Sequence, residues 1–297
     1  MSSSISMGNE FTYKFLTDVN NPKGIVHISH GKGEHMRRYS WLINKLNKDG
    51  YHVISQDHRG HGIWVKNGYK KGKFAESNGW EIITDDLVEL INKTNNDFPA
   101  LNQYLFAHSM GSWVGLSAIM KGLPIKGLIL SGSTKQPRFL TYIIYVIVNA
   151  SIFFNGKDAF NPIMDFISNN NFNKNFKPQR TKDDWISSDP NNVDDYVNDD
   201  LCGFEATNSL WLDFLIDGSR KISNKNNYES VNKKLPVMII SGSKDPFSSS
   251  GKGIKKLSRM LSKIFDNVEN IVFENDRHEV FSGLQKDKAY ELSLIHI

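Results

Sequence analysis

The stretch Tyr104-Leu-Phe-Ala107-His108-Ser109-Met110-Gly111 places a serine where a short apolar run meets the start of a helical pattern. A strand that turns abruptly into a helix projects the serine hydroxyl above the end of a sheet, and the positive N-terminus of the helix points at it. Such a turn is crowded and needs small residues two positions before and two positions after the serine. Ala107 and Gly111 meet this need, although glycine is usual at both positions. The stretch therefore predicts a nucleophilic serine at a sharp strand-to-helix turn.

Short β-rich apolar runs alternate with longer amphipathic stretches on both sides of this turn. This alternation predicts an α/β protein with a mostly parallel central sheet and helices on both faces. The candidate strands are residues 24–29, 52–56, 103–107, 127–130, 237–241 and 270–273, and the candidate helices include 39–48, 80–92, 110–121 and 253–264. The alternation stops between residues 134 and 217. We expect 134–217 to form an inserted, mainly helical lid, and 1–133 with 218–291 to form the core.

Composition narrows the classes of protein that the chain can belong to. With 297 residues, of which 39% are hydrophobic and 23% charged, the chain can bury a sizeable core and is not expected to be disordered. The net charge of +4 is small and no long basic block carries it, which argues against nucleic acid as a partner. Cys202 is the single cysteine of the chain, which excludes an internal disulfide and a cysteine-based metal cluster. The first residues do not resemble a signal peptide, so we expect a cytoplasmic protein.

Two further segments affect the interpretation. Residues 292–297 match the translation of a common sequencing adaptor, and we expect them to be an artefact that hides the true C-terminal sequence after about residue 291. Residues 139–154 are strongly apolar but fall short of the ~20 residues that a spanning helix needs. A buried helix is one interpretation. The other is an interface-seeking helix that lines an acyl pocket and makes transient contact with the inner membrane surface.

A serine hydroxyl is a weak nucleophile, so it needs a base that a carboxylate holds in place. At a strand-to-helix turn of this type the order along the chain is serine, aspartate, histidine. Of the nine histidines, seven precede or adjoin Ser109, and His296 lies in the suspected artefact, which leaves His278. Asp245 directly follows the candidate strand 237–241, whereas no other downstream aspartate follows a strand end so closely; these are Asp266, Asp276 and Asp287. We predict the catalytic set Ser109, Asp245 and His278.

The tetrahedral intermediate of acyl transfer needs backbone N–H donors for its oxyanion. The amide after the nucleophile, that of Met110, is one candidate. The loop His30-Gly31-Lys32-Gly33-Glu34-His35 follows an early strand, and Lys32 N–H is the second candidate. His30, Gly31 and Gly33 support this loop, as Gly111 supports the serine turn. A phosphate-binding loop is the alternative, but the sequence lacks the Gly-Lys-Ser/Thr helix start.

Other polar segments allow plain structural interpretations. His58 and His61 of Asp57-His-Arg-Gly-His-Gly62 could suggest a metal site, but we interpret the segment as a turn in which Arg59 pairs with a carboxylate. Residues 183–217 contain ten acidic residues and no Lys or Arg, and we interpret them as a solvated lid surface, with recognition of a cationic headgroup as the alternative. We interpret Cys202 as a packing residue of the lid. No cofactor and no metal are predicted.

Several motifs resemble the lysophospholipase and monoacylglycerol lipase group of α/β-hydrolases. They are residues 30–39 (His-Gly-x-Gly-Glu-His-x-x-Arg-Tyr), 57–62, 107–111, 241–246 (Ser-Gly-Ser-Lys-Asp-Pro) and 277–279, in this order along the chain. Within the insertion, residues 180–187 and 200–204 are similar to lid segments of the group. The resemblance runs from about residue 10 to 290 and implies the α/β-hydrolase fold, the triad Ser109–Asp245–His278, the oxyanion donors Lys32 and Met110, and single-chain acyl esters as substrates.

These observations lead to an expected function and to two alternatives. We expect a serine hydrolase that cleaves the fatty acyl ester of a lysophospholipid or a monoacylglycerol through an acyl-enzyme intermediate. A carboxylesterase or thioesterase for short acyl chains is the alternative within enzymes. A catalytically silent lipid-binding protein on the same scaffold is the alternative from another class. The headgroup, the acyl length and the oligomeric state stay open.

Overall fold

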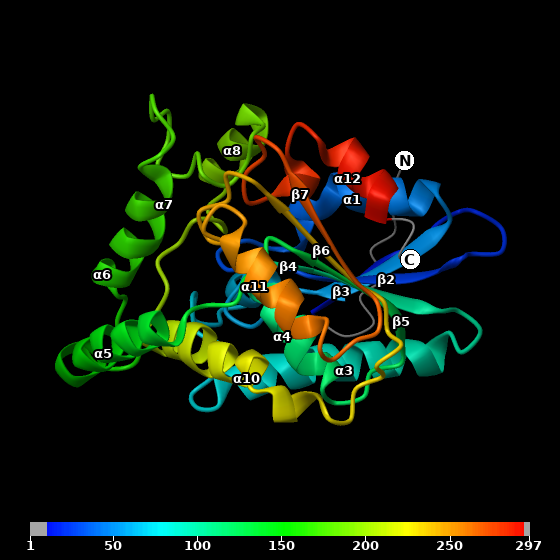
Figure 1. The fold of residues 1–297 in the computed structure, drawn as a ribbon, viewed down its shortest axis with the longest axis horizontal. Coiled ribbons are helices and arrows are strands. Elements are labelled where there is room, and N and C mark those ends of the chain that lie inside the picture. The colour runs from blue at the N-terminus through cyan, green and yellow to red at the C-terminus, as the bar shows by residue number, and fades with distance from the viewer. Residues whose placement is uncertain (1–10, 294–297) are drawn as a thin grey trace.

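A seven-stranded sheet forms the centre of the protein (Figure 1). The computed structural model describes residues 11–293, except for the side chains at positions 169 and 170. The strand order is β1-β3-β2-β4-β5-β6-β7; β1 pairs antiparallel with β3, and all other neighbours are parallel. The strands are β1 (Thr12–Phe15), β2 (Gly24–Ser29), β3 (Tyr51–Gln56), β4 (Gln103–His108), β5 (Ile125–Ser131), β6 (Val237–Gly242) and β7 (Val268–Phe273).

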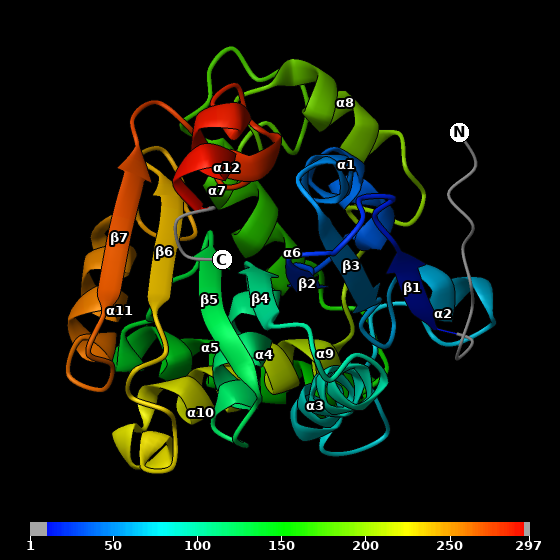
Figure 2. The same cartoon turned by 90° about the vertical axis from the view of Figure 1, so that its right-hand side faces the viewer.

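Helices cover both faces of the sheet (Figure 2). On one side lie α1 and α12, and on the other lie α3, α4 and α10. The longer helices are α1 (Ser40–Lys48), α3 (Gly79–Asp97), α4 (Met110–Ile119), α5 (Arg138–Asn155), α8 (Pro190–Val197), α11 (Lys252–Leu261) and α12 (Lys286–Ser293). The shorter ones are α2 (Gly62–Lys66), α6 (Pro162–Asp165), α7 (Asn171–Asn173), α9 (Asn208–Trp211) and α10 (Ser219–Ser223). Three 3-10 helices, η1 (Met36–Tyr39), η4 (Lys225–Tyr228) and η5 (Val280–Ser282), and two π-helical segments, η2 (Phe166–Asn170) and η3 (Leu212–Gly218), complete the described part of the structure.

Each inner strand contributes to two hydrophobic cores. In β4, Leu105 and Ala107 belong to the core that also contains α3, α4 and α11, whereas Phe106 belongs to the core under α1 and α12. In β5, Leu128 belongs to the first of these cores and Ile129 to the second. Successive side chains of a strand point to opposite faces, so a strand that is covered on both faces must be apolar throughout. This explains the unbroken apolar runs in the sequence.

The predicted fold class is confirmed. All six predicted strands and all four predicted helices form, with ends that shift by a few residues. The additional strand β1 was not predicted, because its four residues Thr12–Phe15 alternate polar and aromatic side chains and lie at the edge of the sheet.

The predicted lid lies within the connection between β5 and β6. Helices α5, α6 and α7 project to one side of the sheet (Figure 1), whereas α10 packs against α4, and η3 packs against α3 and α4. The boundaries 1–133, 134–217 and 218–291 stay a prediction. Of the suspected adaptor residues 292–297, Leu292 and Ser293 continue α12, and the others lie outside the described residues.

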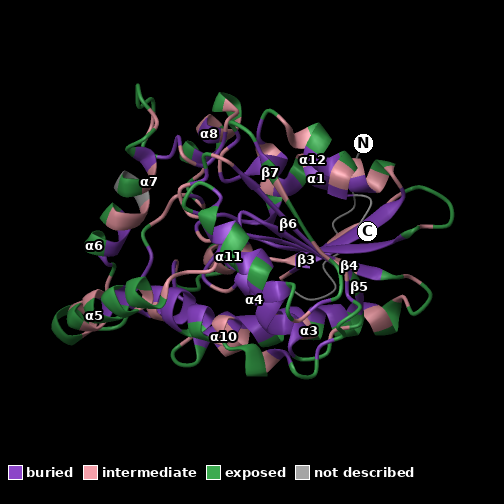
Figure 3. Ribbon diagram, viewed as in Figure 1, coloured by how far each residue is buried: buried purple, intermediate pink, exposed green. Residues whose placement is uncertain are grey.

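Helix α5 turns an apolar surface outward. By length and composition it is the one described helix that could cross a membrane, yet only 11% of it is buried in the protein. Phe139 and Tyr142 are 67% and 68% exposed, and Figure 3 shows most of α5 as exposed or intermediate. A buried core helix over residues 139–154 is therefore the wrong interpretation.

Candidate active site

Ser109 occupies a strained turn between β4 and α4. Its backbone φ of 52° lies in the left-handed region, which costs a non-glycine residue on the order of 1–3 kcal/mol. The turn passes close to β2, and a Cβ on Gly111 would lie 2.1 Å from the carbonyl oxygen of Ser29. Glycine at position 111 is therefore required by this close approach.

Ala107 is accommodated by a second small residue. A Cβ on Gly115 of α4 would lie 3.1 Å from the Ala107 methyl and 3.2 Å from Leu105 Cδ2. The methyl of Ala107 thus fills the space that the missing side chain of Gly115 leaves open. This pairing explains how the turn accepts alanine where glycine is usual.

His278 and Asp245 form a buried pair at the ends of β7 and β6. His278 Nδ1 lies 3.0 Å from Asp245 Oδ1, and both side chains are almost fully buried. The other carboxylate oxygen accepts a hydrogen bond from Ser241 Oγ at 2.8 Å, and Phe247 N–H donates to Asp245 Oδ1 at 2.9 Å. Because the carboxylate accepts at Nδ1, the Nε2 atom of a neutral His278 is left to act as a base.

The electrostatics of the pair follow from this contact. Burial alone would lower the pKa of His278, but the Asp245 carboxylate outweighs it and raises that pKa above 6.5. Burial alone would likewise raise the pKa of Asp245, and His278 and Ser241 reverse the effect. His108 lies beside His278, with ring centroids 4.8 Å apart. Burial lowers the pKa of His108 to about 3, so it stays neutral there.

Ser109 and His278 lie on the wall of one cavity of about 370 Å³. No hydrogen bond joins their side chains within residues 11–293 of the structure. Contacts of this kind are often long in a ligand-free site and shorten when a substrate binds. The rings of Trp185 and Phe247 flank His278 at centroid distances of 5.1 and 5.5 Å. Neither ring was predicted to lie at the site, although Trp185 belongs to the lid segment 180–187 and Phe247 directly follows the motif 241–246.

The predicted oxyanion loop lies directly against the serine turn. A Cβ on Gly31 would lie 3.1 Å from Ser109 Cβ, and Lys32 lines the cavity, with its ammonium group 4.7 Å from the centre of the Trp211 ring. Within the described chain, neither Lys32 N–H nor Met110 N–H donates a backbone hydrogen bond. Both amides are therefore available to a ligand.

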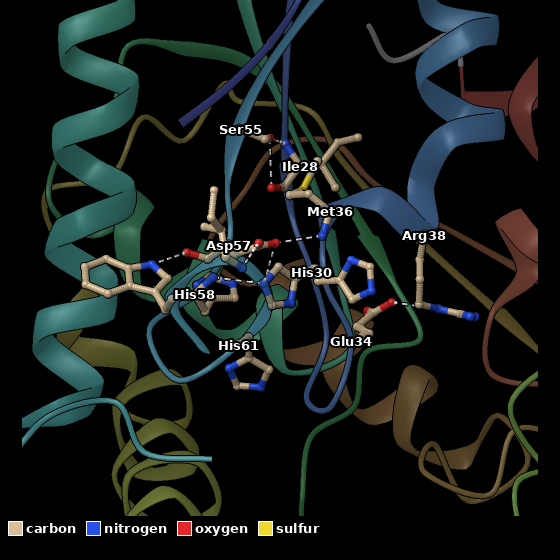
Figure 4. Close-up of polar contacts among 12 residues, drawn as sticks. Ile28, His30, Glu34, Met36, Arg38, Ser55, Asp57, His58 and His61 are labelled. Atoms are coloured by element: carbon tan, nitrogen blue, oxygen red, sulfur yellow. Dashed lines mark hydrogen bonds and ion pairs between the residues drawn. The ribbon is translucent and has the colours of Figure 1, made fainter. Parts of the chain in front are cut away.

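A polar brace, formed by Glu34, Arg38 and Glu279, connects this loop to the segment that follows β7. Glu34 accepts hydrogen bonds from Gly31 N–H at 2.5 Å and from Tyr39 Oη at 2.8 Å. Its second oxygen lies 3.6 Å from Arg38 Nε, and Arg38 Nη2 donates to Glu279 at 2.7 Å. Figure 4 shows Glu34 facing Arg38. Glu279 is the neighbour of His278 in the chain, so the brace links the predicted oxyanion loop to the segment that carries His278.

The segment 57–62 is a structural turn beneath the same loop (Figure 4). Asp57 accepts hydrogen bonds from Met36 N–H and Ile63 N–H, both at 2.7 Å. His58 N–H donates to His30 Nε2 at 2.9 Å, so His30 supports the loop from below. Arg59 makes a two-pronged ion pair with the Asp86 carboxylate at 2.7 and 2.8 Å. These contacts agree with the interpretation of this segment as a turn rather than a metal site.

Much of the cavity wall is apolar. Its lining includes Leu140, Ile144, Met164, Phe172, Phe214 and Phe247. The acidic stretch 183–217 differs from the prediction of a solvated surface, because Asp183, Asp184 and Asp213 are buried. Burial of these carboxylates inside the insertion could not be deduced from composition.

Comparisons with known proteins agree with this geometry. Residues 20–285 match the family described as serine aminopeptidase, S33. The monoglyceride lipase of Rattus norvegicus is 31% identical over 110 residues, which are 37% of this chain and 34% of the rat protein. The matched stretch is thus about a third of that relative's length. The monoglyceride lipase of Saccharomyces cerevisiae is 24% identical over 95% of this chain and 87% of its own length.

Among solved structures, a thermostable carboxyl esterase from Bacillus coagulans in complex with glycerol superposes with a TM-score of 0.85. It is 27% identical, and the match covers 96% of this chain and 92% of the esterase. The family match spans nearly the whole described chain and includes Ser109, Asp245 and His278. The chain belongs to the serine aminopeptidase S33 family and has the α/β-hydrolase fold, and the curated relatives that it resembles include monoglyceride lipases.

Proposed function

We propose that this protein hydrolyses the fatty acyl ester of a single-chain lipid, a lysophospholipid or a monoacylglycerol. The observation that carries the proposal is the buried Asp245–His278 pair, whose histidine lines the same cavity as Ser109, together with the many apolar side chains of that cavity. An ester carbonyl can be held at the polar end while its hydrocarbon chain occupies the apolar end. The resemblance to the lipase group supports the same substrate class.

Acylation begins when Ser109 Oγ attacks the ester carbonyl and His278 Nε2 takes its proton. Asp245 holds the Nδ1–H side of the imidazole and stabilises the imidazolium that forms. The carbonyl oxygen becomes an oxyanion, and the amides of Lys32 and Met110 donate to it. Each such donor contributes roughly 3–4 kcal/mol of transition-state stabilisation. His278 then protonates the leaving glycerol or glycerophosphoryl oxygen, and the acyl group stays on Ser109.

Deacylation repeats these steps with water. His278 removes a proton from a water molecule, the hydroxide attacks the acyl carbonyl, and the same two amides hold the second oxyanion. The collapse of this intermediate returns the proton to Ser109 Oγ and releases the fatty acid. The raised pKa of His278 suits both roles, because the imidazole must accept and donate a proton near neutral pH.

The apolar wall favours a long acyl chain over the short-chain esterase alternative. Leu140 and Ile144 of α5 and Met164 of α6 contribute to it. We also propose that the outer surface of α5 contacts the inner membrane surface from the cytoplasm, since Phe139, Tyr142 and Ile143 lie on it and are exposed. A lipid could then pass from the bilayer to the cavity along one helix.

The test is release of free fatty acid from oleoylglycerol and from oleoyl-lysophosphatidylcholine, measured side by side, with Ser109→Ala as the blank. We expect release from at least one of them, abolished in Ser109→Ala. Faster release from the glycerol ester would make the protein a monoacylglycerol lipase, and faster release from the lysophospholipid would make it a lysophospholipase. If neither is cleaved while short-chain esters are, the short-chain esterase replaces this proposal. If no ester is cleaved, the silent lipid-binding protein replaces it.

A further inference from the structure

Three potential metal ligands meet where the lid touches the segment after the oxyanion loop. His35 Nε2, Asp199 and Cys202 Sγ each offer one donor atom, and the three atoms lie within 4.8 Å of one another. His35 Nε2 is 2.9 Å from Asp199 Oδ2. We propose that His35, Asp199 and Cys202 bind a zinc-like divalent cation that fastens the lid to the oxyanion loop, at a site separate from the catalytic residues.

The local backbone presents two of the ligands together. Asp199 and Cys202 have the x₂ spacing that pairs of zinc ligands commonly use, and Cys202 N–H donates to the Asp199 carbonyl at 2.8 Å to close the turn. Leu201 N–H donates to Asp199 Oδ1 at 2.8 Å and leaves Oδ2 turned to His35. A hydrogen bond that orients a ligating carboxylate in this way is a regular feature of metal sites.

The donor set suits zinc. Imidazole nitrogen, carboxylate oxygen and thiolate sulfur are all zinc ligands, and three protein ligands leave a fourth position for water. Cys202 is only 8% exposed, and its sulfur has no hydrogen-bond partner within the described chain. A cleft of about 250 Å³ lined by His35, Asp199 and Leu201 gives an ion a path to the site.

The positive charge of Arg38 lies near the proposed site, in the same cleft as His35 and Asp199. Arg38 is itself paired with Glu279 at 2.7 Å and lies 3.6 Å from Glu34, so its charge is offset. A divalent cation bound by these three residues would displace the thiol proton of Cys202.

A bound ion would join two parts of the chain that already touch. Gly203 N–H donates to the Gly33 carbonyl at 2.9 Å, and Gly33 lies in the oxyanion loop. The ion would be coordinated by His35, which lies two residues after Gly33, and by Asp199 and Cys202 of the lid turn. Its coordination bonds would thus connect the two segments. Because the ion would bind the folded state and not the unfolded state, the unfolding temperature should rise with the free metal concentration.

The experiment titrates the purified full-length chain with Cd²⁺ and Zn²⁺. We expect one Cd²⁺ per chain with an ultraviolet thiolate-to-metal charge-transfer band, which must come from Cys202 because the chain has no other cysteine. Zinc affinity, measured against a chelating indicator dye, should fall at least about 10- to 100-fold in Cys202→Ser, Asp199→Asn and His35→Gln, since even groups that merely orient ligands have effects of this size. Asp195→Asn, an exposed carboxylate of the same cleft, is the matched control and should bind like the unmodified chain.

Alkylation of Cys202 is measured on the unmodified protein, so its result does not depend on whether the substituted chains fold. Zn²⁺ should slow alkylation of Cys202 in the unmodified protein. Equal zinc affinity of the unmodified chain and Cys202→Ser, Cd²⁺ binding without a thiolate band, or alkylation that zinc does not slow would each overturn the proposal. None of these readouts depends on ester hydrolysis, so they stand or fall independently of the proposed function.

Discussion

In the proposed mechanism, the Asp245 carboxylate orients His278 and also raises its pKa. Because it raises the pKa of His278, activity should rise with pH as the imidazole loses its proton above pH 6.5. In Asp245→Asn the imidazole loses this stabilisation, so the acidic limb of the profile should move to lower pH. The rate on the plateau should fall by about 10⁴, as for a base held in the wrong tautomer.

The measurement is kcat against pH with a soluble ester. The charge-preserving Asp245→Glu is the companion variant, and its acidic limb should stay closer to that of the unmodified protein. An unchanged acidic limb in Asp245→Asn would mean that another group sets the pKa of His278.

For single residues of the site, the sequence predicted that Asp245 and His278 lie close together, but it did not predict the side chains around them. Elimination along the chain led to His278 and Asp245 because each must follow a strand end, and the fold brings these ends together. Trp185 and Phe247 beside His278, and the brace from Glu34 through Arg38, depend on contacts between residues far apart in the chain. Local sequence patterns carry no such information.

Two small residues govern how β4 and α4 pack under the serine. Gly115→Ala gains about 1 kcal/mol of helix propensity but brings a Cβ to 3.1 Å from the Ala107 methyl. In the Ala107→Gly background this contact is gone. We expect Gly115→Ala to be more favourable in that background than in the unmodified protein by about 1 kcal/mol or more.

Denaturant unfolding of the four chains of this double-mutant cycle checks the prediction. The coupling free energy between the two positions is the quantity of interest. Additive effects would show that Ala107 and Gly115 do not constrain each other.

Helix α5 should control binding to lipid vesicles. Phe139→Ser with Ile143→Ser removes two exposed apolar side chains from its outer face and should weaken co-sedimentation with vesicles. Hydrolysis of a soluble short-chain ester should change little, because neither residue lines the cavity. Leu284→Ser is the control: Leu284 is 71% exposed, before α12 and outside α5. Equal loss of binding in both variants would contradict a specific role for α5.

The elements of the core were more predictable than those of the insertion. Strands β2 to β6 are largely buried and read as apolar runs, whereas the edge strand β1 lacks such a run. In the insertion, α6, α7 and α9 have only three or four residues each. Helices this short depend on tertiary packing rather than on propensity. Whether α5 is covered or exposed likewise depends on its neighbours and not on its own sequence.

A buried carboxylate makes the stability of the whole molecule depend on pH. Asp213 is 7% exposed, and burial together with Asp217 raises its pKa to about 7 from 3.8. The folded state therefore binds a proton that the unfolded state has released between these values. By linkage, this contribution to the free energy of unfolding is present below pH 3.8 and is lost as pH rises through 7, by roughly 4 kcal/mol.

Asn at this position cannot ionise, so the free energy of unfolding of Asp213→Asn relative to the unmodified protein should increase between pH 5 and pH 8. Chemical denaturation at several pH values measures this difference. Asp217→Asn, at the exposed neighbour, should show the same trend with a smaller size. A difference that is constant with pH would contradict the raised pKa of Asp213.

In the proposed mechanism, Ser109 is a nucleophile that His278 activates. The most direct test is labelling of the purified protein with a fluorophosphonate probe, followed by peptide mass spectrometry. The account predicts a single label on Ser109, absent in Ser109→Ala and formed at least about a thousandfold more slowly in His278→Ala. A label on another residue, or labelling of Ser109 that is equally fast without His278, would contradict it.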